Sequence, residues 1–329
     1  MTGVGPTLES WFVDRLGRQR QASPQTITSY RDTLRLLLCF IQDRIGKDPS
    51  KLDWSDLDEK AISAFLDHLE SERHNGARTR NLRLTAIRSL FRYAALRHPE
   101  HAGVIQRVLA IPTKRFDKAT VSFLTAEEAA AFIDAPDMHR WEGRRDRALL
   151  VLALQTGLRV SELIGLDCAD VVLGTGGHVR CEGKGRKQRA VPLTRSAQQM
   201  LRVWMAERAG RAGDPLFPTR TGRRLSPDAI ERRVAMHASS AAKHCPSLKG
   251  KNVHPHVLRH SCAMSLLHAR VDVAVIALWL GHADMRSTDA YIHADLSIKE
   301  RALALTTPPS VKPGRYKPPD AVLAFLESL

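Results

Sequence analysis

The stretch Leu278-Trp279-Leu280-Gly281-His282, with the run that continues to Tyr291-Ile292-His293, decides how this chain folds and what it does. Apolar residues at positions 273, 276, 277 and 280 recur at helical spacing, which predicts an amphipathic helix. Gly281 then stands where a helix commonly ends in the left-handed conformation. The pattern therefore predicts a short helix that stops just before His282.

Tyr291 follows at a distance that suits a second short helix. Ser287 and Thr288 can cap that helix, and Tyr291 would then lie one turn from its N-terminus. The amide donors and the dipole at a helix N-terminus favour an anion, so a phenol near a histidine suits attack on a phosphate. A tyrosine in such a place is also commonly a half-buried packing residue. Three other segments bear on the choice between these alternatives.

The first of these segments surrounds Arg159. Residues 148–155 are apolar enough to form a central buried helix, which Thr156-Gly157 would end. Arg159 would open the next helix, where the dipole disfavours a cation. A bound anion would explain the arginine, and an ion pair with Glu162, three residues on, is the alternative.

The second segment is a predicted β-hairpin. Residues 178–182 and 188–192 form two short β-like runs around Gly183-Lys184-Gly185-Arg186-Lys187, where the glycines permit a turn with positive φ. A lysine at this tip can reach into a groove. The GxxxxGK[ST] pattern of a P-loop is absent from the sequence, so ATP is not implied.

The third segment is His254-Pro255-His256-Val257-Leu258-Arg259-His260. Proline is favoured at the first position of a helix, so Pro255 predicts where this helix begins. His256 and Arg259 then share one helix face. A zinc site is not predicted, because Cys or carboxylate ligands at metal spacing are missing nearby. For His256 alone, the alternative is a buried histidine that makes its hydrogen bonds inside the core.

The composition indicates a polyanionic partner. The 329 residues are enough for about two domains, and the formal net charge is +15. A charge of that size favours nucleic acid over a membrane surface, since no polybasic run flanks an exposed apolar helix and no run is long enough to span a bilayer. The N-terminus lacks a signal-peptide pattern. Five scattered cysteines without a CxxC pair indicate reduced thiols in a cytoplasm.

Residues 1–112 are expected to form a helical domain. Ser23-Pro24 is a cap followed by proline, and a later helix should bury Leu82, Ile87, Leu90, Phe91 and Ala94. No acidic residue interrupts the arginines of that helix, so we predict phosphate contacts, with a solvated face as the alternative. The candidates for DNA binding are Arg78, Arg80, Arg83 and Arg88. The basic, proline-interrupted segment 113–124 is predicted to be a linker, and Thr125 to Glu128 forms a capping box.

Taken together, six side chains resemble the catalytic set of the tyrosine recombinase/phage integrase family: Arg159, Lys184, His256, Arg259, His282 and Tyr291. The resemblance covers about residues 125–295. It implies a mainly α fold, with a SAM-like helical core-binding domain and a mostly helical catalytic domain, 125–305, that contains a small β-hairpin sheet. A tail, 306–329, follows.

The resemblance also implies the chemistry. Tyr291 would attack a DNA phosphodiester, Arg159 and Arg259 would hold the non-bridging oxygens, and Lys184 would protonate the leaving 5′-oxygen. His256 would position the phosphate and share proton transfer, and His282 would orient the phosphate or the phenol, without metal or cofactor. The partner is double-stranded DNA, contacted also by Arg186, Lys187 and Arg189, with the protein in a tetrameric synapse at the nucleoid.

The purpose of the reaction is left open by the sequence. Integration, excision, resolution and transposition are all compatible with the motifs. A type IB topoisomerase-like relaxation of DNA and a non-catalytic architectural protein are the alternatives. The oligomeric state of the protein on DNA would distinguish a topoisomerase from a recombinase. A non-catalytic protein is expected to lack one or more of the catalytic side chains, whereas this sequence has all six.

Two departures from the family pattern stand out. The family often has glycine where this chain has Arg270, so we expect the helix end there to use another conformation. The chain also continues well past Tyr291 to an amphipathic end with Val322, Phe325 and Leu329. Because such a short helix is marginal unless it docks, docking on a neighbouring protomer is expected, with docking in cis as the alternative.

Overall fold

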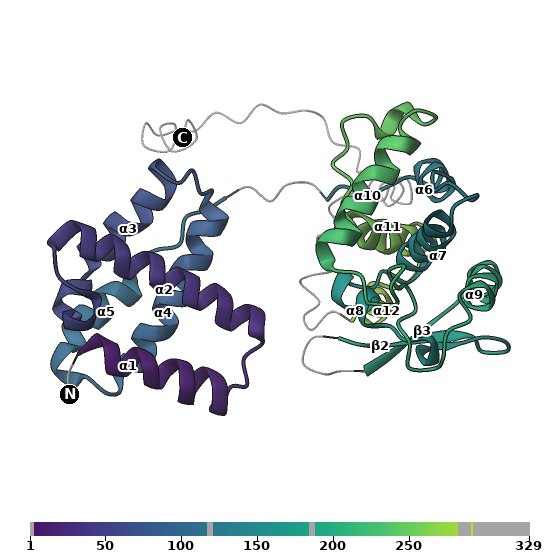
Figure 1. The fold of residues 1–329 in the computed structure, drawn as a ribbon. Helices are drawn as coiled ribbons and strands as arrows, with labels where there is room; N and C mark the ends of the chain where they lie inside the picture. Colours follow the sequence, from purple (N-terminus) through teal and green to yellow (C-terminus); the bar gives the residue numbers. More distant parts are fainter. Residues whose placement is uncertain (1–2, 117–120, 184–187, 282–290, 292–329) are drawn as a thin grey trace, which may run out of the picture. The chain divides into compact units, whose positions relative to one another are not determined.

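The computed structural model describes residues 3–116, 121–183, 188–281 and Tyr291 (Figure 1). The chain forms two compact units, Met1–Lys118 and Ala119–Leu329. Each unit has its own hydrophobic core. No helix within these ranges is both long and apolar enough to cross a membrane. The predicted second helix around Ser287 and the tail 306–329 lie outside the described residues.

The first unit is helical throughout its described part. Its elements are α1 (Val4–Ser10), a π-helical run (Trp11–Gln19), α2 (Pro24–Ile45), α3 (Glu59–Ser71), α4 (Ala77–Ala95) and α5 (Ala102–Ala110), with short 3₁₀ turns between them. The predicted cap of α2 is confirmed, because the Ser23 hydroxyl accepts a hydrogen bond from the Thr26 amide at 3.3 Å. The cap fixes where α2 begins.

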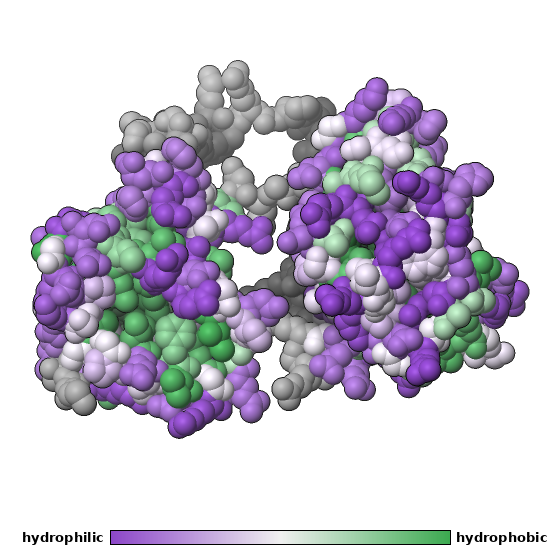
Figure 2. Space-filling view, in the orientation of Figure 1, coloured by the Kyte–Doolittle hydropathy of each residue, from purple (hydrophilic) through white to green (hydrophobic). Residues whose placement is uncertain are grey.

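The core of this unit gathers the aromatic residues Trp11, Trp54, Phe65 and Phe91, all fully buried. Figure 2 shows apolar side chains collected on one face of the unit, over α2 and the helices beside it. The expectation that Leu82 is buried is wrong, since 54% of it is exposed and Leu84 is buried instead. Two residues along a helix turn the side chain by about 200°, so only one of the pair can face the core.

The second unit packs seven helices and a small sheet among its described residues. They are α6 (Ala126–Asp134), α7 (Trp141–Thr156), α8 (Val160–Gly165), β1 (Val171–Val172), β2 (His178–Glu182), β3 (Gln188–Pro192), α9 (Arg195–Arg208), α10 (Pro227–Ala241), α11 (Pro255–His268) and α12 (Val273–Leu280). The capping box of α6 is confirmed: Glu128 accepts from the Thr125 amide at 2.9 Å, and the Thr125 hydroxyl from the Glu128 amide at 3.2 Å. Both predicted strands are present with the predicted bounds.

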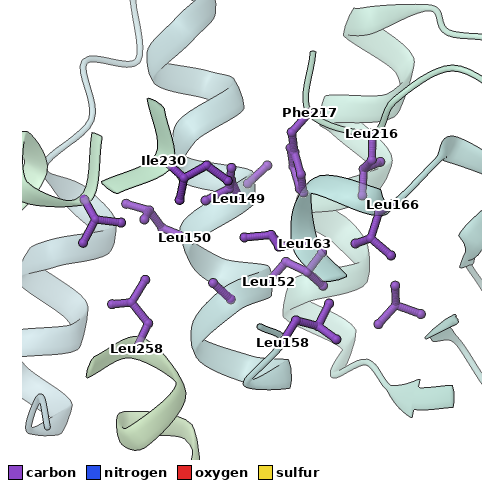
Figure 3. Packing of buried hydrophobic residues seen from close by; sticks show 14 of the residues in the cluster. Leu149, Leu150, Leu152, Leu158, Leu163, Leu166, Leu216, Phe217, Ile230 and Leu258 are labelled. Atoms are coloured by element: carbon purple, nitrogen blue, oxygen red, sulfur yellow. The ribbon is translucent and has the colours of Figure 1, made fainter. Parts of the chain in front are cut away.

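Helix α7 is the centre of the second unit. Its side chains Leu149, Leu150 and Leu152 are buried among residues from α8, α10 and α11 (Figure 3). The antiparallel sheet has the order β1-β2-β3. Its buried residues Val179 and Val191 belong to the same core. The site described below therefore rests on a rigid helix with partners on several sides.

The end of α11 corrects one expectation. Arg270 adopts the left-handed conformation itself, with φ +61°. The Arg270 amide donates to the Leu267 carbonyl and the Val271 amide to the Leu266 carbonyl, both at 3.0 Å. The helix thus ends with the geometry that glycine usually supplies. Arg270 is exposed, so its side chain has room there, but its backbone is strained.

Replacing Arg270 with glycine is therefore expected to stabilise the protein. Relief of the left-handed strain exceeds the extra entropy that glycine gives the unfolded chain, and the net gain should be about 0.5–1 kcal/mol. Chemical denaturation measures it as a higher midpoint. Arg270→Ala is the matched control, because it removes the charge and keeps the strain. An equal gain in both variants would attribute the effect to charge and contradict this account.

Candidate active site

Two helix ends meet at the centre of the candidate site. α7 ends at Gly157 with φ +63°, and α12 ends at Gly281 with φ +64°. A Cβ atom on Gly157 would lie 2.5 Å from a Leu280 methyl carbon, and one on Gly281 would lie 2.8 Å from Arg189 Nη1. Both positions therefore require glycine for conformation and for space. The close approach brings the last carbonyls of α7 and α12 together.

Arg259 lies between these carbonyls. Its guanidinium donates to the Gly157 carbonyl at 2.6 Å and to the Leu280 carbonyl at 2.7 Å, and the residue is 4% exposed. Carbonyls at helix C-termini carry partial negative charge, which holds a cation without cancelling it. Burial, together with the positive charge of Arg159, lowers the pKa of Arg259 to about 10. The side chain is still protonated at neutral pH, and it forms a fixed positive site.

Arg159 and Arg189 share the carboxylate of Glu162. Arg159 Nη1 and Arg189 Nη1 reach Glu162 Oε1 at 2.8 and 2.9 Å, and Arg189 Nη2 reaches Oε2 at 2.8 Å. Arg159 Nη2 also donates to the Gly281 carbonyl at 3.1 Å. The ion pair considered as the alternative for Arg159 thus exists. Two guanidinium groups against one carboxylate nevertheless leave net positive charge beside Arg259, so the pair does not exclude an anion.

Arg189, which the sequence offers as a DNA-binding residue, is used internally here. Its side chain is 13% exposed, and its Nε donates to the Trp279 carbonyl at 3.2 Å. It therefore connects β3 to α8 through Glu162 and to the end of α12. This arrangement braces Arg159, and a DNA contact by Arg189 remains a prediction.

Glu162 titrates far from its ordinary range. Burial alone would raise its pKa from 4.5, but hydrogen bonds from Arg189 and the Arg159 amide outweigh it and lower the pKa to about 2. Because the folded pKa is depressed, the carboxylate contributes its full stability above about pH 4.5, and this contribution is lost as the pH falls toward about 2.

Glu162→Gln should therefore destabilise the protein at neutral pH by roughly 3 kcal/mol, because two partly buried guanidinium groups lose the buried carboxylate that pairs with both. In the variant, the unfolding free energy should also lose the part of its pH dependence that Glu162 contributes between about pH 4.5 and 2. Unfolding free energies measured across this range check both effects. Glu231→Gln, on the exposed side of α10, is the control. If the unfolding free energy of Glu162→Gln fell with acid as it does in the parent, other carboxylates would be responsible for the pH dependence.

Tyr291 is buried beside this positive site. The residue is 3% exposed and packs with Cys262, Met264 and Leu280. Burial raises the pKa of its phenol, while the charges of Arg259 and Arg159 oppose the rise. The phenol and both arginines are thus close enough for their charges to interact. His256, also predicted, is an exposed side chain on α11.

One residue of the site was not predicted. His260 Nδ1 lies 3.1 Å from the Tyr291 hydroxyl oxygen. Its ring stacks near that of His256, with centroids 6.2 Å apart. The signal was present in the sequence, because residues 256 and 260 are four apart and share a helix face. The remaining predicted residues of the site, Lys184, Arg186, Lys187 and His282, lie outside the described residues.

The arginines of α4 divide into internal and exposed groups. Arg80 is 5% exposed and pairs with Glu70 at 3.4 Å, and Arg83 donates to the Thr33 hydroxyl at 2.9 Å. Arg88 donates to the Ile111 carbonyl. Their partners come from other segments, which a search for acids on the same helix does not detect. Arg78 is exposed, and the phosphate contacts of all four stay predictions.

The ends of the predicted linker contact the two units. The Lys114 amide donates to Asn81 of α4 at 3.0 Å, and the Leu124 amide donates to the Ser261 hydroxyl of α11 at 2.8 Å. Within the described part of the chain, no group of three or more His, Cys, Asp or Glu side chains is placed to hold a metal ion.

Comparison with known proteins places these features in a family. Residues 122–297 match the phage integrase family, and residues 10–98 match the phage integrase N-terminal SAM-like domain. The chain is 51% identical to the putative integrase/recombinase y4rC of Sinorhizobium fredii, over 99% of this chain and 98% of that protein. It is 34% identical to the tyrosine recombinase XerC of Azotobacter vinelandii, over 86% of this chain and 90% of that protein.

Solved structures agree on the fold. The XerH site-specific recombinase, in a post-cleavage complex with a palindromic difH substrate, superposes with a TM-score of 0.70 at 24% identity, over 87% of this chain and 81% of that one. The Tn1549 transposon integrase in complex with a circular intermediate DNA superposes with a TM-score of 0.68 at 15% sequence identity. The match covers 92% of this chain and 99% of that one. The predicted fold class, mainly α with a small sheet and a SAM-like first domain, is confirmed. The chain therefore belongs to the phage integrase family of tyrosine recombinases, enzymes that cleave and rejoin DNA strands.

Proposed function

We propose that this chain is a site-specific recombinase that cuts double-stranded DNA through a 3′-phosphotyrosyl link to Tyr291 and rejoins it to a different strand. The observation that carries the proposal is the pair Arg159 and Arg259, fixed by the carbonyl ends of α7 and α12 beside the buried phenol. A DNA phosphate is the anion that fits two such guanidinium groups, since their planar forks match its oxygens.

The reaction begins at the phenol oxygen. Tyr291 Oη forms a bond to phosphorus, and the bond from phosphorus to the 5′-oxygen breaks. Negative charge grows on the non-bridging oxygens, where Arg159 and Arg259 supply preorganised donors. By family resemblance, Lys184 protonates the leaving 5′-oxygen, His256 positions the phosphate and shares proton transfer, and His282 orients the phosphate or the phenol.

The phosphotyrosyl bond keeps the energy of the broken phosphodiester. A 5′-hydroxyl from another strand can then attack it, so rejoining needs no ATP. The alternative of a purely architectural DNA-binding protein offers no reason to bury a phenol beside two fixed cations. The choice of partner strand separates recombination from simple relaxation of the DNA.

DNA binding would use the net positive charge of the chain. Arg78, Arg80, Arg83, Arg88, Arg186, Lys187 and Arg189 are the proposed phosphate contacts. Among them Arg78 is exposed, whereas Arg80 would first have to leave Glu70. Strand exchange between two duplexes needs four active sites, so we place the protein in a tetrameric synapse at the nucleoid. A structure of similar fold, λ integrase, was solved as a dimer bound to a COC′ core site, which is an assembly of more than one protomer on DNA.

The test is to trap the covalent complex in cells and sequence the attached DNA. We expect protein on the 3′ ends, free 5′-hydroxyl ends opposite, and one recurring sequence at the breaks. The sequence would also show whether the breaks belong to a mobile element or to a resolution site. Protein attached to 5′ ends, or adducts spread without a common sequence, would contradict the proposal.

A further inference from the structure

Helix α11 carries a row of histidines that leads to the phenol. His254 caps the helix, and the rings of His254 and His256 lie 6.3 Å apart. The ring of His260 follows at 6.2 Å from that of His256, with an angle of 25° between the two planes. The row ends at Tyr291, whose ring centroid lies 5.5 Å from that of His260. Within this row, His260 is the histidine in hydrogen-bonding contact with the phenol oxygen.

The charge states of the pair follow from its surroundings. Burial, with the positive potential of His256, His254 and Arg259, lowers the pKa of His260 to about 4. Burial raises the pKa of Tyr291. At neutral pH the imidazole and the phenol are therefore both uncharged. The phenol O–H then donates to an unprotonated Nδ1, and the ring carries its own proton on Nε2.

From this contact, and resting on the function proposed above, we propose that His260 is a catalytic residue that accepts the Tyr291 proton during attack on the phosphate. The Oη–H bond breaks as the bond from Oη to phosphorus forms, and the proton moves to His260 Nδ1. The bond from phosphorus to the 5′-oxygen breaks, and that oxygen takes a proton from Lys184. In the rejoining step His260 returns its proton to the phenol oxygen.

The substrate itself would switch the base on. In the chain without DNA, the burial and the nearby positive charges that keep His260 neutral also make it a poor proton acceptor, so the nucleophile stays protonated. A phosphate held by Arg159 and Arg259 offsets that positive potential and raises the basicity of the imidazole. Proton transfer therefore becomes favourable only when the anion is in place. This timing would protect the enzyme from side reactions of a free phenolate.

His256 is the competing candidate for this role, and geometry favours His260. The described contacts of His256 are ring contacts with its two histidine neighbours, and its side chain is exposed to solvent. An exposed imidazole that shares a helix face with Arg259 suits an incoming phosphate. The buried phenol instead meets the next histidine along the same face. His256 would thus contact the phosphate, and His260 would contact the phenol.

The test varies the acidity of the nucleophile. His260→Ala is expected to slow covalent cleavage of the recovered DNA site by a factor of about 10²–10⁴ with tyrosine at position 291. Difluorotyrosine and trifluorotyrosine at that position ionise more readily and need less help from a base. The rate difference between His260→Ala and the parent should therefore shrink along the series. His244→Ala is the matched control and should stay within about twofold of the parent, since His244 is an exposed histidine just after the end of α10 and outside this row.

A second substrate separates the nucleophile from the leaving group. A 5′-bridging phosphorothiolate leaves without a proton donor, so it should not rescue His260→Ala. Rescue by this substrate, or an equal loss with every tyrosine analogue, would overturn the role proposed for His260. If the parent protein formed no adduct at all, the proposed function itself would fail, which is a different result. DNA binding measured in parallel should be unchanged in His260→Ala.

Discussion

Tyr291→Phe should abolish the covalent protein–DNA adduct completely while leaving DNA affinity close to that of the parent. The change removes one oxygen atom, which is the proposed nucleophile, and keeps the ring that packs with Cys262, Met264 and Leu280. Because the phenol hydrogen bond reaches a partly buried histidine, His260, the loss of stability should be limited to about 1 kcal/mol. A denaturing gel of protein mixed with end-labelled DNA measures the adduct.

Tyr93→Phe provides the matched control. Tyr93 is a buried tyrosine of the first unit, and its hydroxyl lies within hydrogen-bonding distance of the Ser10 hydroxyl. Its loss should cost comparable stability and leave the adduct intact. An adduct that persists in Tyr291→Phe would mean that another side chain attacks the phosphate. Loss of the adduct in both variants would indicate a general effect on folding.

The features that were predicted correctly depend on neighbours in the sequence. Ser23 and Thr125 cap helices through bonds to residues three positions later, and the antiparallel strands β2 and β3 follow one another closely in the sequence. Gly157 and Gly281 are recognisable because each follows an apolar helical run. Such signals act over a few residues, so a local pattern contains all the information they need.

The features that were missed depend on contacts between distant segments. Asp146 is buried with Arg145, its neighbour, but its other oxygen accepts from Arg233 and His237 of α10. Strand β1 has two residues, too few to show any alternation. Arg270 was misjudged for another reason. Glycine is preferred in the left-handed conformation but is not required there, and the end of α11 tolerates the strain at Arg270.

The same distinction applies within the candidate site. The family resemblance identified the residues with assigned roles, but the contact between His260 and Tyr291 joins positions 31 apart. Likewise Glu162 could be foreseen as a partner of Arg159, three residues away, but not of Arg189. The family resemblance thus predicts the groups that we propose to meet the phosphate, and the structure adds the contacts of Arg189 with Glu162 and of His260 with Tyr291.

Arg159→Ala is the second change with a large expected effect. It should reduce the single-turnover rate of cleavage by about 10³-fold, because it removes a donor that is fixed where transition-state charge develops. Binding should persist, since many other cations are proposed to contact the DNA backbone and one phosphate contact contributes only part of the affinity. Arg159 is a suitable target because its side chain is 30% exposed and Glu162 keeps Arg189 as a partner when it is lost.

Two further variants sharpen this test. Arg159→Lys keeps the charge but loses the fork that reaches both Glu162 and the Gly281 carbonyl, so it should recover only a small part of the rate. Arg202→Ala, on α9, removes an exposed arginine whose guanidinium contacts Gln199, and should leave the rate unchanged. If Arg159→Ala retained its fold but lost DNA binding together with cleavage, Arg159 would position the DNA and would not stabilise the transition state. Full activity in Arg159→Lys would mean that charge alone suffices, and the fork held by Glu162 and the Gly281 carbonyl would then be unnecessary.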